Sequence, residues 1–232
     1  MEIKVVYEDK NFVAVSKPAG LLVHGTLSSG KSRDEETLVD WLIERFPEIK
    51  NVGDDTKIRP GIVHRLDKDT SGIILIPRNQ EYFNYLKSLF QRHDIKKTYL
   101  ALVNGHVLSQ EGTISKPIGL KSGTIKHTVN VKGAKMVKPA ETEYKVKKYI
   151  GNYTLLGVSP KTGRTHQIRV HLASIGHPIV GDKIYGKKEE SLKPSRLFLH
   201  ADSLEFSPEP NKNLKLSVDF PEELQEILKS VT

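Results

Sequence analysis

Residues 64–77 read HRLDKDTSGIILIP and join a charged loop to an apolar run. The loop carries Arg65, Asp67 and Asp69 within five residues, and a Thr-Ser-Gly turn follows them. The run GIILIP has no polar face, which is typical of a strand that is buried on both sides of a sheet. We therefore expect both aspartates to lie at the edge of a core strand, where a buried scaffold holds their side chains in place.

The segments around this strand predict an α+β fold rather than a doubly wound sheet, because strands and helices do not alternate regularly. Helices are expected where an N-cap residue precedes apolar residues three and four positions apart, after Thr37, Asn79 and Thr165. The third of these is expected to end at Gly176. Another helix is expected at 221–231, and strands or hairpins at 3–17, 72–78, 96–107, 112–149, 153–160, 196–206 and 213–220. The sequence shows no repeat or linker, so we predict a single domain over residues 1–232, with a polar loop at 25–36.

Composition indicates a globular protein with a polyanionic partner. Charged residues make up 28% of the chain, and the formal net charge is +8 with an isoelectric point near 9.4. A positive excess of this size favours a partner such as nucleic acid. The chain has no cysteine, which excludes disulfides and thiolate metal sites and fits a cytoplasmic protein. No apolar run reaches the roughly 18 residues of a membrane-spanning helix, and the N-terminus has no signal-peptide pattern.

The positive charge is concentrated in residues 121–148. This segment holds eight lysines, and its acids are Glu141 and Glu143. One interpretation is a solvated, lysine-rich edge that blocks pairing between sheets. The other is a surface that contacts phosphates, and the charge of the whole chain favours it.

Three groups of residues could carry chemistry, and none of them includes a cofactor motif. The sequence has no glycine-rich dinucleotide turn and no phosphate-binding loop. A hard cation at His64, Asp67 and Asp69 would have an incomplete oxygen shell, so we expect His64 to be structural and Asp69 to cap its loop. Each group also has an ordinary explanation as a turn, an ion pair or a core aromatic residue. The groups are Arg65 with Asp67 and Asp69, the segment 163–172 with Arg164, His166 and Arg169, and the strand 96–103 with Tyr99.

Five blocks of the sequence, in order, resemble the RluA-type pseudouridine synthases. They are KPAGLLVH (17–24), GIVHRLDKDTSG (61–72), KKTYLALV (96–103), GRTHQIRVHLASIGHPIVGDKIYG (163–186) and RLFLHA (196–201). They span most of the chain, and such an ordered set is far more specific than HRLD alone. The resemblance implies the pseudouridine synthase catalytic fold, with a mixed, largely antiparallel β-sheet core flanked by helices and loops. It also implies an RNA pseudouridine synthase, an enzyme that isomerises uridine in RNA without a cofactor or metal.

The resemblance assigns roles to five residues. Asp67 matches the catalytic aspartate, and Arg169 matches the basic residue that pairs with it. Tyr99 matches the active-site tyrosine that packs on the uracil ring, and Leu199 matches an apolar residue that lines the pocket. Arg65 matches the arginine that enters the space vacated by a flipped nucleotide.

These residue types suit the isomerisation. Breaking the N-glycosidic bond of uridine puts positive charge on the sugar, and a carboxylate such as Asp67 can stabilise or attack it. A close guanidinium from Arg169 keeps that carboxylate ionised and fixes its rotamer. Tyr99 can hold the detached uracil by stacking while the ring turns, and Arg65 can fill the gap that the extruded nucleotide leaves. Whether Asp67 attacks the sugar, attacks the base or removes a sugar proton stays open.

Two other functions fit parts of the sequence. A non-catalytic RNA-binding factor in ribosome assembly would explain the basic charge, but Asp67, Tyr99 and Arg169 together argue for catalysis. A glycoside-processing enzyme could use Asp67 and Asp69. Trp41 is the only tryptophan that could stack on a sugar, and the basic charge would have no purpose.

RNA is the expected partner, and the resemblance implies ribosomal RNA or transfer RNA. Many relatives carry a small RNA-binding domain ahead of the catalytic one. The blocks here begin near residue 1, so we expect that domain to be absent and target choice to rest on loops of the catalytic domain. We expect a monomer in the cytoplasm, with no membrane, metal or cofactor.

Overall fold

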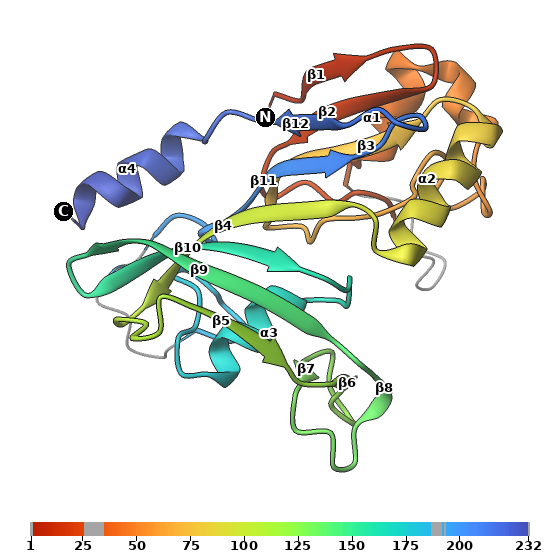
Figure 1. Cartoon of the computed structure of the whole chain (residues 1–232). Helices are drawn as coiled ribbons and strands as arrows, with labels where there is room; N and C mark the ends of the chain where they lie inside the picture. Colours follow the sequence, from red (N-terminus) through yellow and green to blue (C-terminus); the bar gives the residue numbers. More distant parts are fainter. Residues whose placement is uncertain (1, 26–34, 187–191, 193, 232) are drawn as a thin grey trace. The chain divides into compact units, whose positions relative to one another are not determined.

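The computed structural model describes residues 2–25, 35–186, 192 and 194–231 (Figure 1). The chain divides into two compact units, each made of two segments: residues 1–95 with 203–218, and residues 96–202 with 219–232. Each unit is therefore described by itself, and the single domain remains a prediction. The polar loop predicted at 25–36 lies mostly outside the described residues.

A largely antiparallel sheet forms the centre of the first unit, with antiparallel pairs β1-β2, β2-β3 and β11-β12. β1 pairs with β2, and β2 pairs with β3 in a register that places Val15 opposite Ile74. The end of β11 continues the order after β3, and β12 pairs with β11. All seven residues of β3 are buried, which confirms the predicted core strand. The bounds are β1 Lys4–Glu8, β2 Phe12–Lys17, β3 Ser71–Pro77, β11 Leu199–Phe206 and β12 Leu214–Ser217.

The helices of the first unit begin at the predicted caps. Thr37 caps α1 and forms a capping box with Asp40, and Asn79 caps α2 by accepting from the amide of Tyr82. A short 3₁₀ helix follows α1. The bounds are α1 Leu38–Arg45, the 3₁₀ helix η1 Pro47–Asn51 and α2 Gln80–Arg92.

The second unit has a sheet in the order β11, β4, β10, β9 and β5, and β11 contributes its first residues here. Strands β4, β10, β9 and β5 pair antiparallel in this order. A small sheet in the order β7, β6, β8 accompanies it. These strands confirm the hairpins predicted at 112–149 and the α+β class. The bounds are β4 Lys96–Asn104, β5 Glu111–Ser115, β6 Ile118–Leu120, β7 His127–Thr128, β8 Lys135–Lys138, β9 Glu141–Ile150 and β10 Tyr153–Pro160.

The start of α3 (Gln167–Ser174) differs from the prediction, because its N-cap is His166 and not Thr165. His166 has a left-handed φ of 55° and makes no side-chain cap. The buried Gln167 explains the shift. Its Nε2 donates to the carbonyl of Glu141 at 2.8 Å and its Oε1 accepts from the amide of Arg164 at 3.0 Å, so this residue ties the incoming loop to β9.

The other helix ends follow their local signals. α3 stops two residues before the predicted Gly176, whose φ of 88° reverses the chain. The closing helix α4 (Glu222–Ser230) lies within the predicted segment. None of the helices in the described part of the chain combines the length and the hydropathy that crossing a bilayer requires.

His200 on β11 is a buried titratable group in the second unit. Its side chain has no exposed surface, and the ring of Phe220 meets it edge-on at 5.9 Å. Burial, with a smaller effect from the charge of Arg196, lowers the pKa of His200 to about 4. The folded protein therefore holds this histidine in its neutral form at neutral pH.

We expect His200 to make the protein sensitive to mild acid. The unfolded chain takes up a proton at this residue below its ordinary pKa of 6.5, whereas the folded protein does so only near pH 4. The stability from neutral His200 is thus complete above about pH 6.5 and is lost as the pH falls toward 4, by about 2–3 kcal/mol at about pH 4.5. Urea unfolding of wild type and His200→Gln at about pH 7 and about pH 4.5 measures this loss. Equal losses in the two proteins would contradict the prediction.

Candidate active site

Asp67 lies in the loop that enters β3, as the sequence predicts. Its backbone carbonyl accepts from the amide of Thr70 at 3.1 Å, which closes a turn directly before the strand. The side chain of Asp67 is half-buried, whereas Arg65 and Asp69 are exposed. The loop thus presents its charged groups from the end of a fully buried strand.

Lys17 holds this loop from inside the first unit. The residue has no exposed surface, and its Nζ donates to three carbonyl oxygens. These belong to Pro18 at 2.7 Å, Leu21 at 2.8 Å and Lys68 at 3.1 Å. The amide of Gly20 donates to the same Lys68 carbonyl at 2.8 Å. Lys17 therefore ties the segment 17–21 to the residue beside Asp67, and the ammonium group satisfies polar backbone that burial would otherwise leave unpaired.

Arg65 has a neutral histidine as its neighbour. Its Nη1 lies 3.2 Å from Nε2 of His24, and Nδ1 of His24 lies 2.8 Å from the carbonyl of Gly25. A proton on Nδ1 satisfies both contacts, with Nε2 accepting from Arg65. Burial, with smaller effects from the charges of Arg65 and Arg59, lowers the pKa of His24 despite the opposing hydrogen bond to Gly25. Arg65 is thus oriented by an uncharged partner.

His64 is occupied by structural contacts. Its Nε2 accepts from the amide of Leu75 on β3 at 2.8 Å, and its ring stacks on Phe90 of α2 with centroids 4.5 Å apart. No cluster of metal-ligating side chains is present among the described residues.

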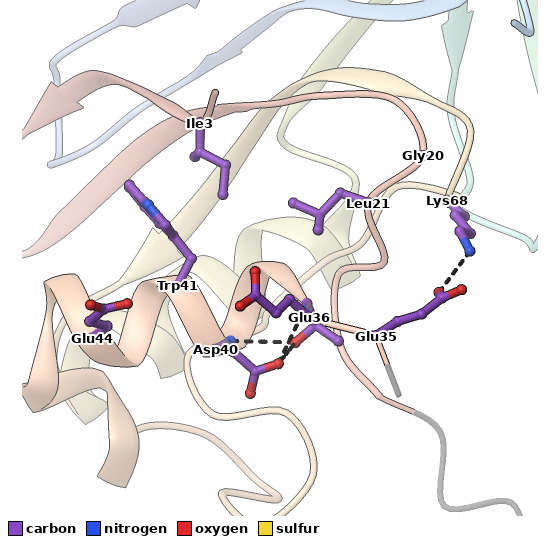
Figure 2. A pocket seen from close by; sticks show the side chains of 10 residues that line it. Ile3, Gly20, Leu21, Glu35, Glu36, Asp40, Trp41, Glu44 and Lys68 are labelled. Atoms are coloured by element: carbon purple, nitrogen blue, oxygen red, sulfur yellow. Dashed lines mark hydrogen bonds and ion pairs between the residues drawn. The ribbon is translucent and has the colours of Figure 1, made fainter. Parts of the chain in front are cut away.

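A cavity of about 560 Å³ lies beside Lys68 in the first unit (Figure 2). Figure 2 shows Trp41 and Ile3 on one side and the ion pair of Lys68 with Glu35, at 2.7 Å, on the other. The acids among its lining residues disfavour a phosphate as its occupant. The lining residues are Ile3, Gly20, Leu21, Glu35, Glu36, Thr37, Asp40, Trp41, Glu44 and Lys68.

Tyr99 and Leu199 lie on strands of the second unit. Tyr99 is on β4, half-buried, and pairs in register with Val158 of β10. Leu199 begins β11, is 3% exposed, and belongs to the hydrophobic core of this unit. The strands predicted for both residues are confirmed.

Arg169 on α3 is buried in an ion pair with Asp182. Nε and Nη2 each donate to one carboxylate oxygen at 2.8 Å, and the exposed fractions of the two side chains are 4% and 0%. Burial alone would raise the pKa of Asp182. The hydrogen bond and charge of Arg169, with the amides of Tyr185 and Ile184, outweigh burial and lower it. The pairing predicted between Arg169 and Asp67 stays a prediction, because the two residues belong to different units.

Tyr185 supports the guanidinium of Arg169 from its face. The ring centroid lies 5.4 Å from Cζ of Arg169, within the range of a cation–π interaction. The hydroxyl oxygen accepts from the amide of His127 at 3.0 Å and lies 3.0 Å from Nδ1 of His166. Tyr185 therefore links Arg169 to His166 and to strand β7.

The structure thus brings Arg65 together with His24, and Arg169 together with Asp182. Neither partner was predicted from the sequence, although each lies in one of the five blocks. Asp182 had a usable signal, because it is the only carboxylate within residues 163–186 and a buried arginine requires an acid. His24 had none, since it was one of nine histidines without distinctive spacing.

Comparison with known proteins gives a consistent result. A family model described as RNA pseudouridylate synthase matches residues 11–174. The ribosomal large subunit pseudouridine synthase D of Borreliella burgdorferi is 39% identical over 94% of this chain and 65% of its own. An uncharacterized RNA pseudouridine synthase of Aquifex aeolicus is 42% identical over 85% of this chain and 60% of its own. The chain thus spans less than two thirds of the length of these curated relatives.

Among solved structures, human RNA pseudouridylate synthase domain containing 1 superposes with a TM-score of 0.77. It is 28% identical, and the match covers 97% of this chain and 87% of the human one. A second human protein, RNA pseudouridylate synthase domain containing 4, has a TM-score of 0.76 at 24% identity and shares the fold.

We expect Asp182→Asn to destabilise the protein by about 3–5 kcal/mol near pH 7, because it leaves the charge of Arg169 buried without a counter-ion. The lowered pKa means that the stability from ionised Asp182 is present above its unfolded value of 3.8. It is lost as the pH falls through the folded value, so the two proteins should converge in acid. Urea unfolding followed by circular dichroism measures the difference.

Glu143→Gln is the matched control. Glu143 pairs with Lys161 at 2.8 Å, but both side chains are nearly half exposed. Loss of this ion pair should lower the free energy of unfolding by less than about 1 kcal/mol. If the two substitutions lower the free energy of unfolding by similar amounts, burial of the Arg169–Asp182 pair does not raise its contribution to stability.

Proposed function

The chain belongs to the RNA pseudouridylate synthase family, and from this premise we propose that it isomerises uridine in RNA to pseudouridine, with Asp67 as the catalytic carboxylate. The observation that carries the proposal is the placement of Asp67. It follows the HRL sequence in a loop that Lys17 ties down and that a fully buried strand continues. A carboxylate held in this way is preorganised for a charge that develops during the reaction.

The reaction needs no second substrate. The bond between C1′ and N1 breaks, the uracil turns, and C1′ bonds to C5. The hydrogen on C5 leaves to solvent as a proton and N1 takes up a proton, so nothing is oxidised or reduced. Asp67 stabilises or attacks the electron-poor centre while the glycosidic bond is broken.

Arg169 is the proposed partner of Asp67. Its pair with Asp182 uses Nε and Nη2, and we propose that Nη1 serves the catalytic carboxylate. The bidentate pair fixes the plane of the guanidinium, which gives that nitrogen a defined direction.

Tyr99, Leu199 and Arg65 complete the proposed machinery. The half-buried ring of Tyr99 offers a face for the uracil while it turns, and Leu199 supplies apolar contact. Arg65 is exposed and bonded to a neutral His24, so it can leave that partner at low cost and occupy the gap left by a flipped nucleotide.

We propose large-subunit ribosomal RNA as the substrate, because the Borreliella relative carries that name. Transfer RNA is the alternative that the experiment below separates. The eight lysines of residues 121–148 are all exposed and would contact the RNA backbone, and Lys135–Lys138 of β8 is exposed along its whole length.

We expect Asp67→Ala to abolish pseudouridine formation while RNA binding stays largely intact, because one carboxylate adds little affinity for a polyanion. The matched control is Asp69→Ala, which removes an exposed acid from the same loop and should retain activity. The measurement is chemical mapping of pseudouridine in unmodified transcripts of large-subunit ribosomal RNA and of transfer RNA. Activity in Asp67→Ala would refute its role. Binding without any pseudouridine formation by the wild type would favour the non-catalytic RNA-binding factor.

We expect replacement of Lys126, Lys135 and Lys138 by Gln to weaken RNA binding and to lower the slope of log affinity against log salt by about 2. The control replaces three exposed lysines elsewhere, Lys10, Lys50 and Lys229, and removes the same net charge. Filter binding over a range of KCl concentrations provides both slopes. If the two triple variants behave alike, residues 121–148 do not form the RNA surface.

A further inference from the structure

Two cations of the second unit lie in one loop region and bond there to backbone carbonyls. Nζ of Lys97, on β4, donates to the carbonyl of Thr162 at 3.3 Å. Nε of Arg164, two residues further along that loop, donates to the carbonyl of Pro139 at 3.0 Å. Within the described residues, neither side chain forms an ion pair with a carboxylate. The loop therefore collects two positive charges that no carboxylate of the described residues neutralises.

One lysine of the same loop does pair with an acid. Lys161 pairs with Glu143 of β9 at 2.8 Å. The amide of Glu141, also on β9, donates to Oγ1 of Thr162 at 3.1 Å, so the strand and the loop are tightly joined. Among the described residues Lys161 thus has a carboxylate partner, whereas Lys97 and Arg164 bond to backbone carbonyls.

The environment of Lys97 disfavours the protonated, charged form of its side chain. The side chain is half-buried, and burial, followed by the charge of Arg164, lowers its pKa to about 8. A ligand with negative charge would offset both effects, because it replaces lost hydration and screens the two cations from each other.

Lys97 also has a defined position relative to Tyr99. Residues two apart on a strand project from the same face, with their Cα atoms about 7 Å apart. Both residues belong to β4. One ribose separates a base from its own phosphates, so an anion at Lys97 and a base on Tyr99 can belong to the same stretch of RNA.

We propose that Lys97 and Arg164 bind one backbone phosphate of the substrate RNA, next to the uridine that Tyr99 receives. The inference rests on the proposed function, because it takes Tyr99 as the uracil platform. The ammonium group supplies a point charge and the guanidinium a planar donor, and both suit phosphate oxygens. The site would fix the register of the RNA, whereas the exposed lysines of residues 121–148 supply general affinity.

The test is RNA binding by Lys97→Gln, Arg164→Gln and the double variant. With an unmodified transcript of large-subunit ribosomal RNA, the double variant should bind about tenfold more weakly. Its slope of log affinity against log salt should fall by about 1. Lys161→Gln removes the same kind of charge from the same loop and should leave the slope unchanged. Slopes that fall equally in Lys97→Gln and Lys161→Gln would overturn the proposal.

Three further arms make the outcome decisive. Lys97→Arg keeps the charge and should retain the wild-type slope, even if a neutral variant folds poorly. In short RNAs around the modified uridine, a neutral methylphosphonate replaces one backbone phosphate at a time. At a single position, this replacement should remove the difference in RNA affinity between wild type and Lys97→Gln. Free inorganic phosphate that raises the melting temperature of the wild type, with no change in RNA slope between variants, would assign the site to small anions and overturn the proposal.

The proposed function can fail separately. If the wild type binds RNA but forms no pseudouridine, the isomerase assignment is wrong, while the salt slopes still decide whether Lys97 and Arg164 hold a phosphate.

Discussion

The buried ion pair between Arg169 and Asp182 is the interaction on which the role proposed for Arg169 depends. Taking two charges out of water costs several kcal/mol for each ion, which only good geometry and additional hydrogen bonds repay. Asp182 meets that demand by accepting from both guanidinium nitrogens and from the amides of Ile184 and Tyr185. These bonds fix the turn after Asp182 and the orientation of Arg169 on α3 together. The guanidinium therefore has its direction before any substrate arrives, which is the condition for electrostatic preorganisation.

The first unit uses a buried cation in a different way. Nζ of Lys17 donates to three carbonyl oxygens, so its charge holds two loops together. The contrast with Arg65 is informative. Arg65 is exposed and its neighbour His24 is neutral, so little electrostatic energy opposes its movement. A fixed Arg169 and a movable Arg65 match the two roles proposed for them, one beside the catalytic carboxylate and one in the gap of a flipped nucleotide.

Local signals in the sequence predicted most of the elements and the family. The caps Thr37 and Asn79 and the buried strand after the HRLD loop are confirmed, because each depends on residues close in sequence. The family resemblance seen in five ordered blocks is confirmed by the match over residues 11–174. The predicted cap Thr165 is wrong, because the side chain of Gln167 reaches across to β9 and delays the helix. Such contacts depend on tertiary structure, and so do the partners of Arg65 and Arg169, which local propensity cannot encode.

For binding of a polyanion, the local arrangement of charged side chains matters more than the net charge of the chain. Salt screens exposed charges beyond about 10 Å at ordinary ionic strength, so a net charge of +8 does not say where a polyanion binds. The cavity beside Lys68 carries Glu35, Glu36 and Glu44 and repels phosphates despite that total. The loop after β10 shows the same effect over four residues: Glu143 pairs with Lys161, whereas the charge of Arg164 acts on Lys97. The proposed phosphate site therefore includes Arg164 and not Lys161, although the sequence presents both as basic, because Lys161 already has Glu143 as its partner.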